Sequence, residues 1–166
     1  MIIRNETSFD IETISKITIA AFKNLAISNH TEQFIINSLR KANALTISLV
    51  AEIDGQVVGH IAFSPVTISD GAIRWYGLGP VSVLPEYQKK GIGKSLIGEG
   101  LTLLKKLGGQ GCVLVGHPDY YKRLGFQNLP ELVYEGVPQE VFFALPFTEK
   151  VPKGIVLFSE GFLAKG

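Results

Sequence analysis

The chain has 166 residues, of which 46% are hydrophobic and 19% charged, and its formal net charge is +1 at pH 7. This length and composition are typical of one folded domain with a buried core, and they exclude an intrinsically disordered chain. The balanced charge argues against a nucleic-acid-binding surface, which normally needs a strongly basic face.

Membrane attachment and secretion are not expected either. No apolar run approaches the roughly 20 residues that span a bilayer. Arg4, Glu6 and Asp10 interrupt the segment where the apolar part of a signal peptide would begin. The single cysteine, Cys112, lies in an apolar run, cannot form an intramolecular disulfide and is expected to be a buried, inert thiol. We therefore expect a cytoplasmic protein.

Apolar spacing and turn residues predict the elements of the first half of the chain. They are a strand at 2–4, a helix capped by Ser8 or Asp10 that carries Ile11, Ile14, Ile17 and Ala21, a helix from 31 that offers Phe34, Ile35, Leu39 and Ala42 to the core, and strands at 49–53 and 57–63. The intervening Asp54-Gly55 is a strong hairpin signal.

The second half continues the same alternation of strands and helices. It contains a central strand at 75–84, a helix after Gly93 that carries Leu96, Leu101, Leu104 and Leu107 and stops at Gly108-Gly109, a strand at 112–115, a short helix from Asp119 to Gly125, and closing strands at 141–145 and 155–158. The strands at 75–84 and 112–115 are joined through a helix and should be parallel. Pro80 cannot donate a hydrogen bond to a neighbouring strand, so a bulge or gap is expected there. This order predicts an α+β fold with a mixed sheet, in one domain spanning residues 1–166.

The most informative segment is 81–96, where an apolar strand leads into a glycine loop and a helix start. The first N–H groups of a helix lack internal partners and favour anions, and Gly91 and Gly93 have no Cβ to keep a phosphate at a distance. Three lysines add positive charge around the loop: Lys89, Lys90 and Lys94. The pattern alone leaves two interpretations open, a pyrophosphate site or a lysine-rich surface turn.

Two motifs carry a family resemblance. Gln88-Lys89-Lys90-Gly91-Ile92-Gly93 matches the pattern Q/R-x-x-G-x-G/A in full, and the segment 117–126 contains a Tyr followed by a basic residue, an apolar residue, Gly and Phe. The chain resembles the GNAT acetyltransferase superfamily at these motifs. The stretches 58–66 and 137–142 resemble a bacterial branch of N-acetyltransferases, so the resemblance covers essentially the whole chain. It implies a GNAT fold with helices on both faces of the sheet and a splayed parallel strand pair, acetyl-CoA as cosubstrate, and no metal.

The resemblance also implies roles for individual residues. The backbone of the loop would bind the pyrophosphate, the backbone of Val81 and Val83 would bind the pantetheine amides, and the Val81 N–H would face the thioester oxygen. The alternative for the two valines is plain core packing. The implied cofactor-binding residues are Val81, Ser82, Val83, Gln88, Lys89, Lys90, Gly91, Ile92, Gly93, Lys94, Ser95, His117 and Tyr121.

Tyr121 matches the family tyrosine that protonates the leaving CoA thiolate. A phenol with an ordinary pKa of about 10 is protonated at pH 7 and can donate to a sulfur anion. Helical spacing places Tyr120 about 100° away, so both cannot face the sulfur equally. His117 takes a strand-end position where related sequences often carry Asp or Asn that orient the cofactor or a water. The alternatives are a core tyrosine and a surface histidine.

The general base is not apparent in the sequence. Gly77 and Gly79 occupy the positions where several family members place Glu or His, on a face we expect them to share with Val81 and Val83. The glycines should leave room above the thioester for a bulky substrate. A water chain could end at one of three residues: His60, Glu52 or His117.

The resemblance therefore implies an N-acetyltransferase that moves an acetyl group directly to a primary amine of a small molecule or protein. The alternative is a catalytically silent acyl-CoA-binding module. A dinucleotide-binding oxidoreductase is disfavoured because G-x-G-x-x-G is absent. The acceptor site should be built from the first two helices and the later strands, with three carboxylates that could attract a cationic amine: Glu32, Glu135 and Glu140. The acceptor is not identified, and the protein could be a monomer or a homodimer paired through its closing strands.

Overall fold

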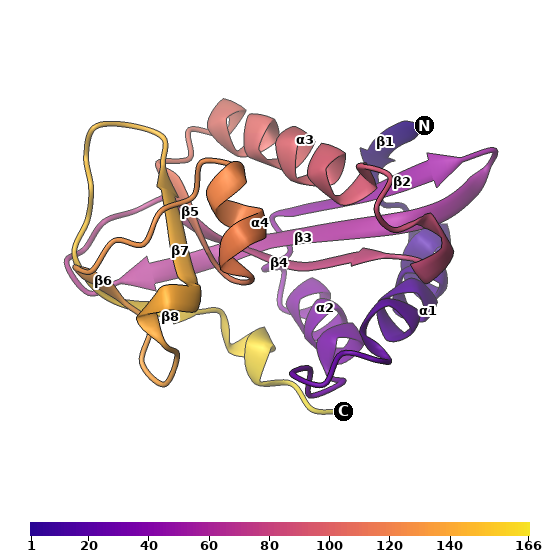
Figure 1. Cartoon of the computed structure of the whole chain (residues 1–166), viewed down its shortest axis with the longest axis horizontal. Helices are drawn as coiled ribbons and strands as arrows, with labels where there is room; N and C mark the ends of the chain where they lie inside the picture. The colour runs from indigo at the N-terminus through magenta and orange to yellow at the C-terminus, as the bar shows by residue number, and fades with distance from the viewer.

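An eight-stranded mixed sheet organises the computed structural model, which describes residues 1–166 (Figure 1). Its strands are β1 (Ile2–Asn5), β2 (Ile47–Ile53), β3 (Gln56–Ile68), β4 (Trp75–Val83), β5 (Gly111–Val115), β6 (Leu132–Val133), β7 (Phe142–Pro146) and β8 (Gly154–Phe158). The order is β1-β2-β3-β4-β5-β7, while β8 pairs with the end of β3 and with β6.

Four α-helices and four short 3₁₀ turns complete the fold. The helices are α1 (Ile11–Phe22), α2 (Glu32–Lys41), α3 (Ile92–Lys106) and α4 (Pro118–Arg123), and the turns lie at Ser8–Asp10, Pro85–Tyr87, Gln139–Val141 and Glu160–Leu163. The predicted order of strands and α-helices and the α+β class are confirmed; among strands and α-helices, only the two-residue β6 was not expected. None of the helices has both the length and the apolar character needed to cross a bilayer.

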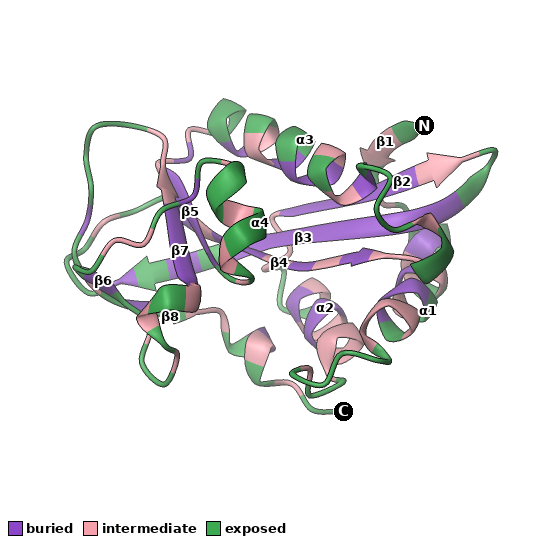
Figure 2. Cartoon of the chain, viewed as in Figure 1, coloured by how far each residue is buried: buried purple, intermediate pink, exposed green.

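The helices cover both faces of the sheet, and the buried residues concentrate between the layers (Figure 2). On one face α3 approaches β3 so closely that a Cβ at Gly100 would overlap the ring of Phe63. On the other face Ile14 and Ile17 of α1 and Ile36 of α2 pack with the sheet. These contacts fix the layers around the centre of the sheet.

Two of the predicted core positions are wrong. Phe34 is half-buried, as are Ile11, Ala21 and Leu101, and α2 turns Ile35, Ile36 and Leu39 fully inward. Ala42 and Leu107 are exposed, because each follows the last residue of its helix. The hairpin prediction is confirmed, since Asp54 and Gly55 have φ values of 49° and 78° between antiparallel β2 and β3.

The strands β4 and β5 separate near their middle. Their parallel pairing covers Trp75, Tyr76 and Gly77 of β4, whereas β4 continues to Val83. On its other side β4 pairs with β3 through Leu78 and again through Val81, which leaves Gly79 and Pro80 opposite a single residue. The predicted parallel pair and the predicted irregularity at Pro80 are both confirmed. Beyond Gly77, the edge of β4 that faces β5 has no strand partner.

Candidate active site

A cavity of about 720 Å³ opens where β4 and β5 separate. It reaches from the bulge in β4 and the start of α4 to α1, α2 and the C-terminal turn. Its lining residues are Phe22, Leu25, Ile27, Glu32, Ile35, Leu78, Gly79, Pro80, Val81, Ile97, Val115, Gly116, His117, Tyr120, Tyr121, Tyr134, Val137, Phe158 and Phe162. Three predicted site residues are among them: Val81, His117 and Tyr121.

The glycine loop leaves the first N–H groups of α3 available to a ligand. Gly91 lies just before the helix with φ +84°, and the first intrahelical hydrogen bond runs from the Ser95 N–H to the Gly91 carbonyl oxygen at 3.0 Å. The N–H groups of the three preceding residues therefore have no acceptor within the helix. The Gln88 side-chain amide donates to the Val83 carbonyl oxygen at 2.9 Å, which ties the loop to the end of β4. The geometry suits an anion such as a pyrophosphate.

The other predicted loop residues divide between solvent and core. Lys89, Lys90 and Lys94 are exposed, whereas the Ile92 side chain is buried in the α3 core. The Lys90 ammonium lies 5.4 Å from the centre of the Tyr87 ring. Positive charge thus surrounds the loop while the Ile92 side chain anchors it.

The end of β4 presents its side chains to opposite faces of the sheet. Val81 and Val83 pack against the α3 core. Ser82 is buried on the other face, where its hydroxyl donates to Thr18 Oγ1 at 3.4 Å. The valine side chains therefore do serve as packing. The backbone of this strand edge has no strand partner and stays open to a ligand, apart from the Val83 carbonyl oxygen, which accepts from Gln88.

Two tyrosines of α4 reach the cavity from one side. The Tyr121 ring packs over Gly116 and lies 5.8 Å from the Phe126 ring, and burial raises the pKa of Tyr121 to about 12. The Tyr120 ring stands edge-on to it at 5.0 Å. The Tyr120 hydroxyl lies near Gly93, 3.5 Å from where a Cβ would stand. Both phenols are protonated at neutral pH, with Tyr120 directed at the loop and Tyr121 held deeper.

Of the three candidate bases, only His117 lines the cavity. It is exposed and directly precedes α4. Glu52 lies away from the cavity, beside Arg4 at 3.5 Å.

His60 is fully buried, and burial lowers its pKa to about 4. Ser48 has one hydroxyl proton, which it donates to the Glu6 carboxylate, so it accepts from His60 Nε2–H at 2.7 Å. His60 is therefore neutral, with its lone pair on Nδ1, and it belongs to a structural network.

The expectation for Gly77 is wrong. The bulge at Gly79 and Pro80 shifts the alternation of β4, so Leu78 shares the α3 face with Val81 while Gly77 faces the opposite side. A Cβ at Gly77 would overlap the Phe158 ring, so the expected room is already filled. Gly79 does line the cavity, and a Cβ there would meet nothing within 4 Å.

The structure adds residues that the sequence did not single out. Tyr134, Phe158 and Phe162 form an aromatic wall, with neighbouring ring centres 4.8 and 5.0 Å apart. They come from segments with no motif, and only the pairing of β8 with β3 brings Phe158 to the site. Of the three carboxylates considered, only Glu32 lines the cavity.

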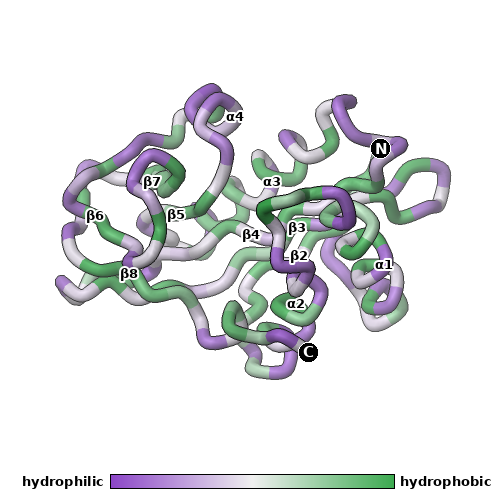
Figure 3. The backbone as a smooth tube through the Cα atoms, turned by 60° about the horizontal axis from the view of Figure 1, so that its bottom comes forward, coloured by the Kyte–Doolittle hydropathy of each residue, from purple (hydrophilic) through white to green (hydrophobic).

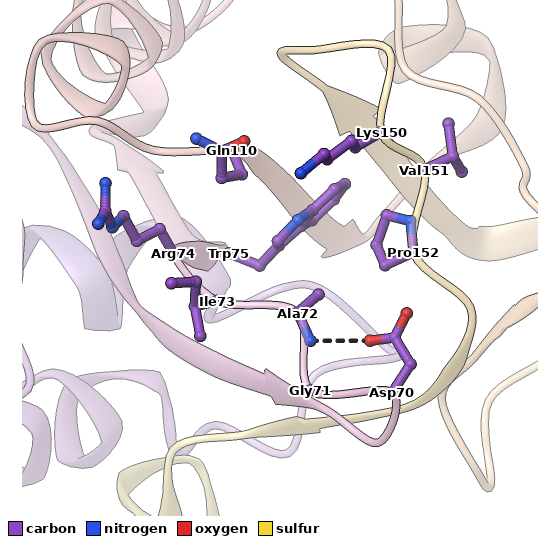
Figure 4. A pocket seen from close by; sticks show the side chains of 10 residues that line it. All are labelled: Asp70, Gly71, Ala72, Ile73, Arg74, Trp75, Gln110, Lys150, Val151 and Pro152. Atoms are coloured by element: carbon purple, nitrogen blue, oxygen red, sulfur yellow. Dashed lines mark hydrogen bonds between the residues drawn. The ribbon is translucent and has the colours of Figure 1, made fainter.

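A second cavity, of about 670 Å³, lies at the other end of β4 (Figure 4). It is lined by Asp70, Gly71, Ala72, Ile73, Arg74, Trp75, Gln110, Lys150, Val151 and Pro152. Asp70 folds back to accept a hydrogen bond from the Ala72 N–H at 2.9 Å. None of the predicted site residues is there.

Comparison with known proteins places the chain in a family. The family model described as "Acetyltransferase (GNAT) domain" matches residues 45–128, which include β4, the glycine loop, α3 and both tyrosines. The chain belongs to the GNAT acetyltransferase family. "Uncharacterized N-acetyltransferase YhbS" of Escherichia coli is 35% identical over 128 residues, which are 76% of this chain and 74% of that protein.

Solved GNAT structures share the whole architecture. A GNAT family acetyltransferase from Brucella melitensis, in complex with acetyl-CoA, is 48% identical and superimposes with a TM-score of 0.87 over 97% of both chains. YhbS from Escherichia coli, in complex with CoA, gives a TM-score of 0.90 at 29% identity, over 99% of this chain and 93% of that one. The protein thus has the GNAT fold and is an N-acetyltransferase by family.

Proposed function

We propose that the protein transfers the acetyl group of acetyl-CoA directly to a primary amine, and that residues 1–166 act as one N-acetyltransferase domain. The supporting observation is that one cavity joins the unpaired edge of β4 to the phenol of Tyr121, with the open start of α3 at its side. The Brucella melitensis and Escherichia coli relatives, solved with acetyl-CoA and CoA, support the same cosubstrate here.

The cosubstrate is held along its length by backbone groups. The pyrophosphate lies against the N–H groups of the loop and the first turn of α3, with lysine charge around it. The pantetheine arm follows the free edge of β4 at Val81 and Val83, as an added strand would. This leaves the thioester at the β4 bulge, inside the cavity.

Transfer then needs three events at that point. The amine nitrogen attacks the thioester carbonyl carbon, forming a C–N bond, and the negative charge on the carbonyl oxygen faces the Val81 N–H. One such donor typically contributes about 3 kcal/mol to transition-state stabilisation. The C–S bond breaks as the tetrahedral intermediate collapses, and the Tyr121 phenol donates its proton to the departing CoA thiolate. An amine that arrives as the ammonium ion first loses one proton toward the cavity mouth, where His117 is exposed, because only the neutral nitrogen has a lone pair for attack. The nitrogen loses a second proton after attack, and this proton restores the Tyr121 phenol.

Acetyl-CoA binding and release of free CoA thiol test this proposal. Acetyl-CoA should raise the melting temperature, by the equivalent of about 2.7 kcal/mol at a hundredfold excess over Kd, while NAD and NADP should not. A panel of primary amines should then release free thiol. No melting shift at millimolar acetyl-CoA would exclude the cosubstrate. Binding without thiol release for any amine would favour the silent acyl-CoA-binding module.

A further inference from the structure

The part of the cavity farthest from the loop is almost entirely apolar. It is contributed by the end of α1, the α1–α2 loop, α2, the segment before β7, β8 and the C-terminal turn. Its residues are Phe22, Leu25, Ile27, Ile35, Tyr134, Val137, Phe158 and Phe162. Leu25 and Ile27 are exposed, Ile27 by 90%, although they line a cavity. Apolar surface left open in this way is typical of a ligand-binding face.

This apolar wall is continuous with the place proposed for the thioester. The Phe158 ring fills the space over Gly77, and Gly79 and Val81 of β4 line the same cavity. The C-terminal turn, Glu160–Leu163, lies beside α2 in both views of the chain (Figures 1 and 3). A Cβ at Gly161 would contact Leu39 of α2 at 2.8 Å, so the turn is held firmly in place. A molecule that enters here meets the aromatic wall on its way to the bulge.

One carboxylate interrupts the apolar lining. Glu32 accepts a hydrogen bond from the Ser28 hydroxyl at 2.8 Å, and no lysine, arginine or histidine forms an ion pair with it. By contrast, Glu6 and Asp10 are each paired with an arginine. Glu32 thus forms no ion pair at the apolar cavity, although Lys23 and His30 line a smaller pocket together with it, and its negative charge favours a cationic group of a ligand. The aromatic faces of Phe158 and Phe162 can also attract a cation.

We propose that the acceptor is a small primary amine with an aromatic or similarly bulky apolar body, an identification that rests on the proposed function. Glu32 attracts the ammonium group as the amine enters, and the wall of Tyr134, Phe158 and Phe162 then holds the apolar body so that the nitrogen, once deprotonated, faces the thioester at the β4 bulge. A polyamine or an amino sugar would bury polar groups against this wall without hydrogen-bond partners, which costs binding energy.

Binding of amines to the protein saturated with CoA tests the inference without requiring turnover. Phenethylamine and ethanolamine carry the same primary amine and differ in the phenyl group. Calorimetry should show phenethylamine binding at least about 10-fold more tightly, as burial of a ring predicts. The same order should hold for kcat/KM with acetyl-CoA, and spermidine should be a poor acceptor.

Two pairs of matched variants locate the binding site. Glu32→Gln should weaken phenethylamine binding about five- to tenfold. Its control is Glu135→Gln, which should not weaken binding, because Glu135 is an exposed carboxylate next to Tyr134 that does not line the cavity. Ile27→Ser should weaken it about threefold or more, whereas Ile73→Ser, 65% exposed at the opposite end of β4, should not. All four should bind CoA as the parent does.

The outcomes separate this inference from the proposed function. Three results would overturn the inference and leave acetyl transfer intact. The two amines could bind equally, spermidine could bind more tightly than phenethylamine, or the Glu32→Gln and Ile27→Ser variants could bind phenethylamine as their controls do. Tight, Glu32-dependent phenethylamine binding with no thiol release would support the amine site and overturn the transferase proposal instead.

Discussion

The position of the pyrophosphate can be tested with two glycines of the same helix. Gly93 lies in the first turn of α3, and a Cβ there would be 3.5 Å from the Tyr120 hydroxyl, which is an ordinary contact. Gly98 lies one and a half turns later, is exposed, and a Cβ there would meet nothing within 4 Å. Gly93→Val and Gly98→Val are therefore matched variants, because a Cβ is accommodated at both positions, and only the first places a branched side chain at the proposed phosphate site. Alanine is not used, because the family pattern allows it at position 93.

The two variants should have similar effects on stability and different effects on CoA binding. Glycine and valine are both weak helix formers, within about 0.5 kcal/mol of each other, so neither variant should melt far below the parent. The branched side chain at position 93 displaces a phosphate from its N–H donors. Loss of one hydrogen bond to a charged group costs about 1.5–3 kcal/mol, which weakens CoA binding about 10- to 150-fold.

Calorimetric titration with CoA, beside thermal melting of the free protein, measures both quantities. Gly98→Val should bind CoA with the parental Kd. If Gly93→Val is folded and also keeps that Kd, the pyrophosphate does not lie against the first turn of α3, and the argument from the open N–H groups fails.

Three further predictions concern single side chains. Tyr121→Phe should keep the acetyl-CoA affinity and lower kcat at least about tenfold, because general acids contribute about 10²–10⁴-fold to the rate. The control, Tyr120→Phe, should lower kcat much less. Equal turnover for Tyr121→Phe and the parent would refute the proton donation. Burial lowers the pKa of His60 to about 4 from 6.5 in the unfolded chain, so below pH 6.5 the unfolded chain binds a proton that the folded protein does not. The free energy of unfolding, measured with urea, should therefore fall by about 3 kcal/mol between pH 6.5 and 4. A His60→Gln variant that shows the same fall would contradict this explanation. Cys112 is 0% exposed and burial raises its pKa, so a thiol reagent should label it only in urea, and rapid labelling of the native protein would show that the β5 core opens.

The sequence by itself determined the features that are local along the chain. The hairpin at Asp54-Gly55, the glycine loop before α3 and the tyrosine pair of α4 each depend on residues within about ten positions of one another, and each lies where the pattern predicted. The sequence also predicted the parallel pairing of β4 and β5, because two neighbouring strands that are joined through a helix are almost always parallel. These local motifs led to the family and to the acetyl-CoA end of the site.

Only the tertiary structure decided which residues line the proposed acceptor end. Strand alternation alone placed Gly77 on the face of Val81, but the two-residue bulge between them reverses the faces, because side chains alternate with a period of two. The space at Gly77 is filled by Phe158, 81 positions later, through the pairing of β8 with β3. The sequence did not distinguish Glu32 from Glu135 and Glu140, and only the position of α2 in the fold shows that Glu32 lines the cavity. Contacts between residues so far apart in the chain depend on the register and packing of the whole sheet, which no local pattern specifies.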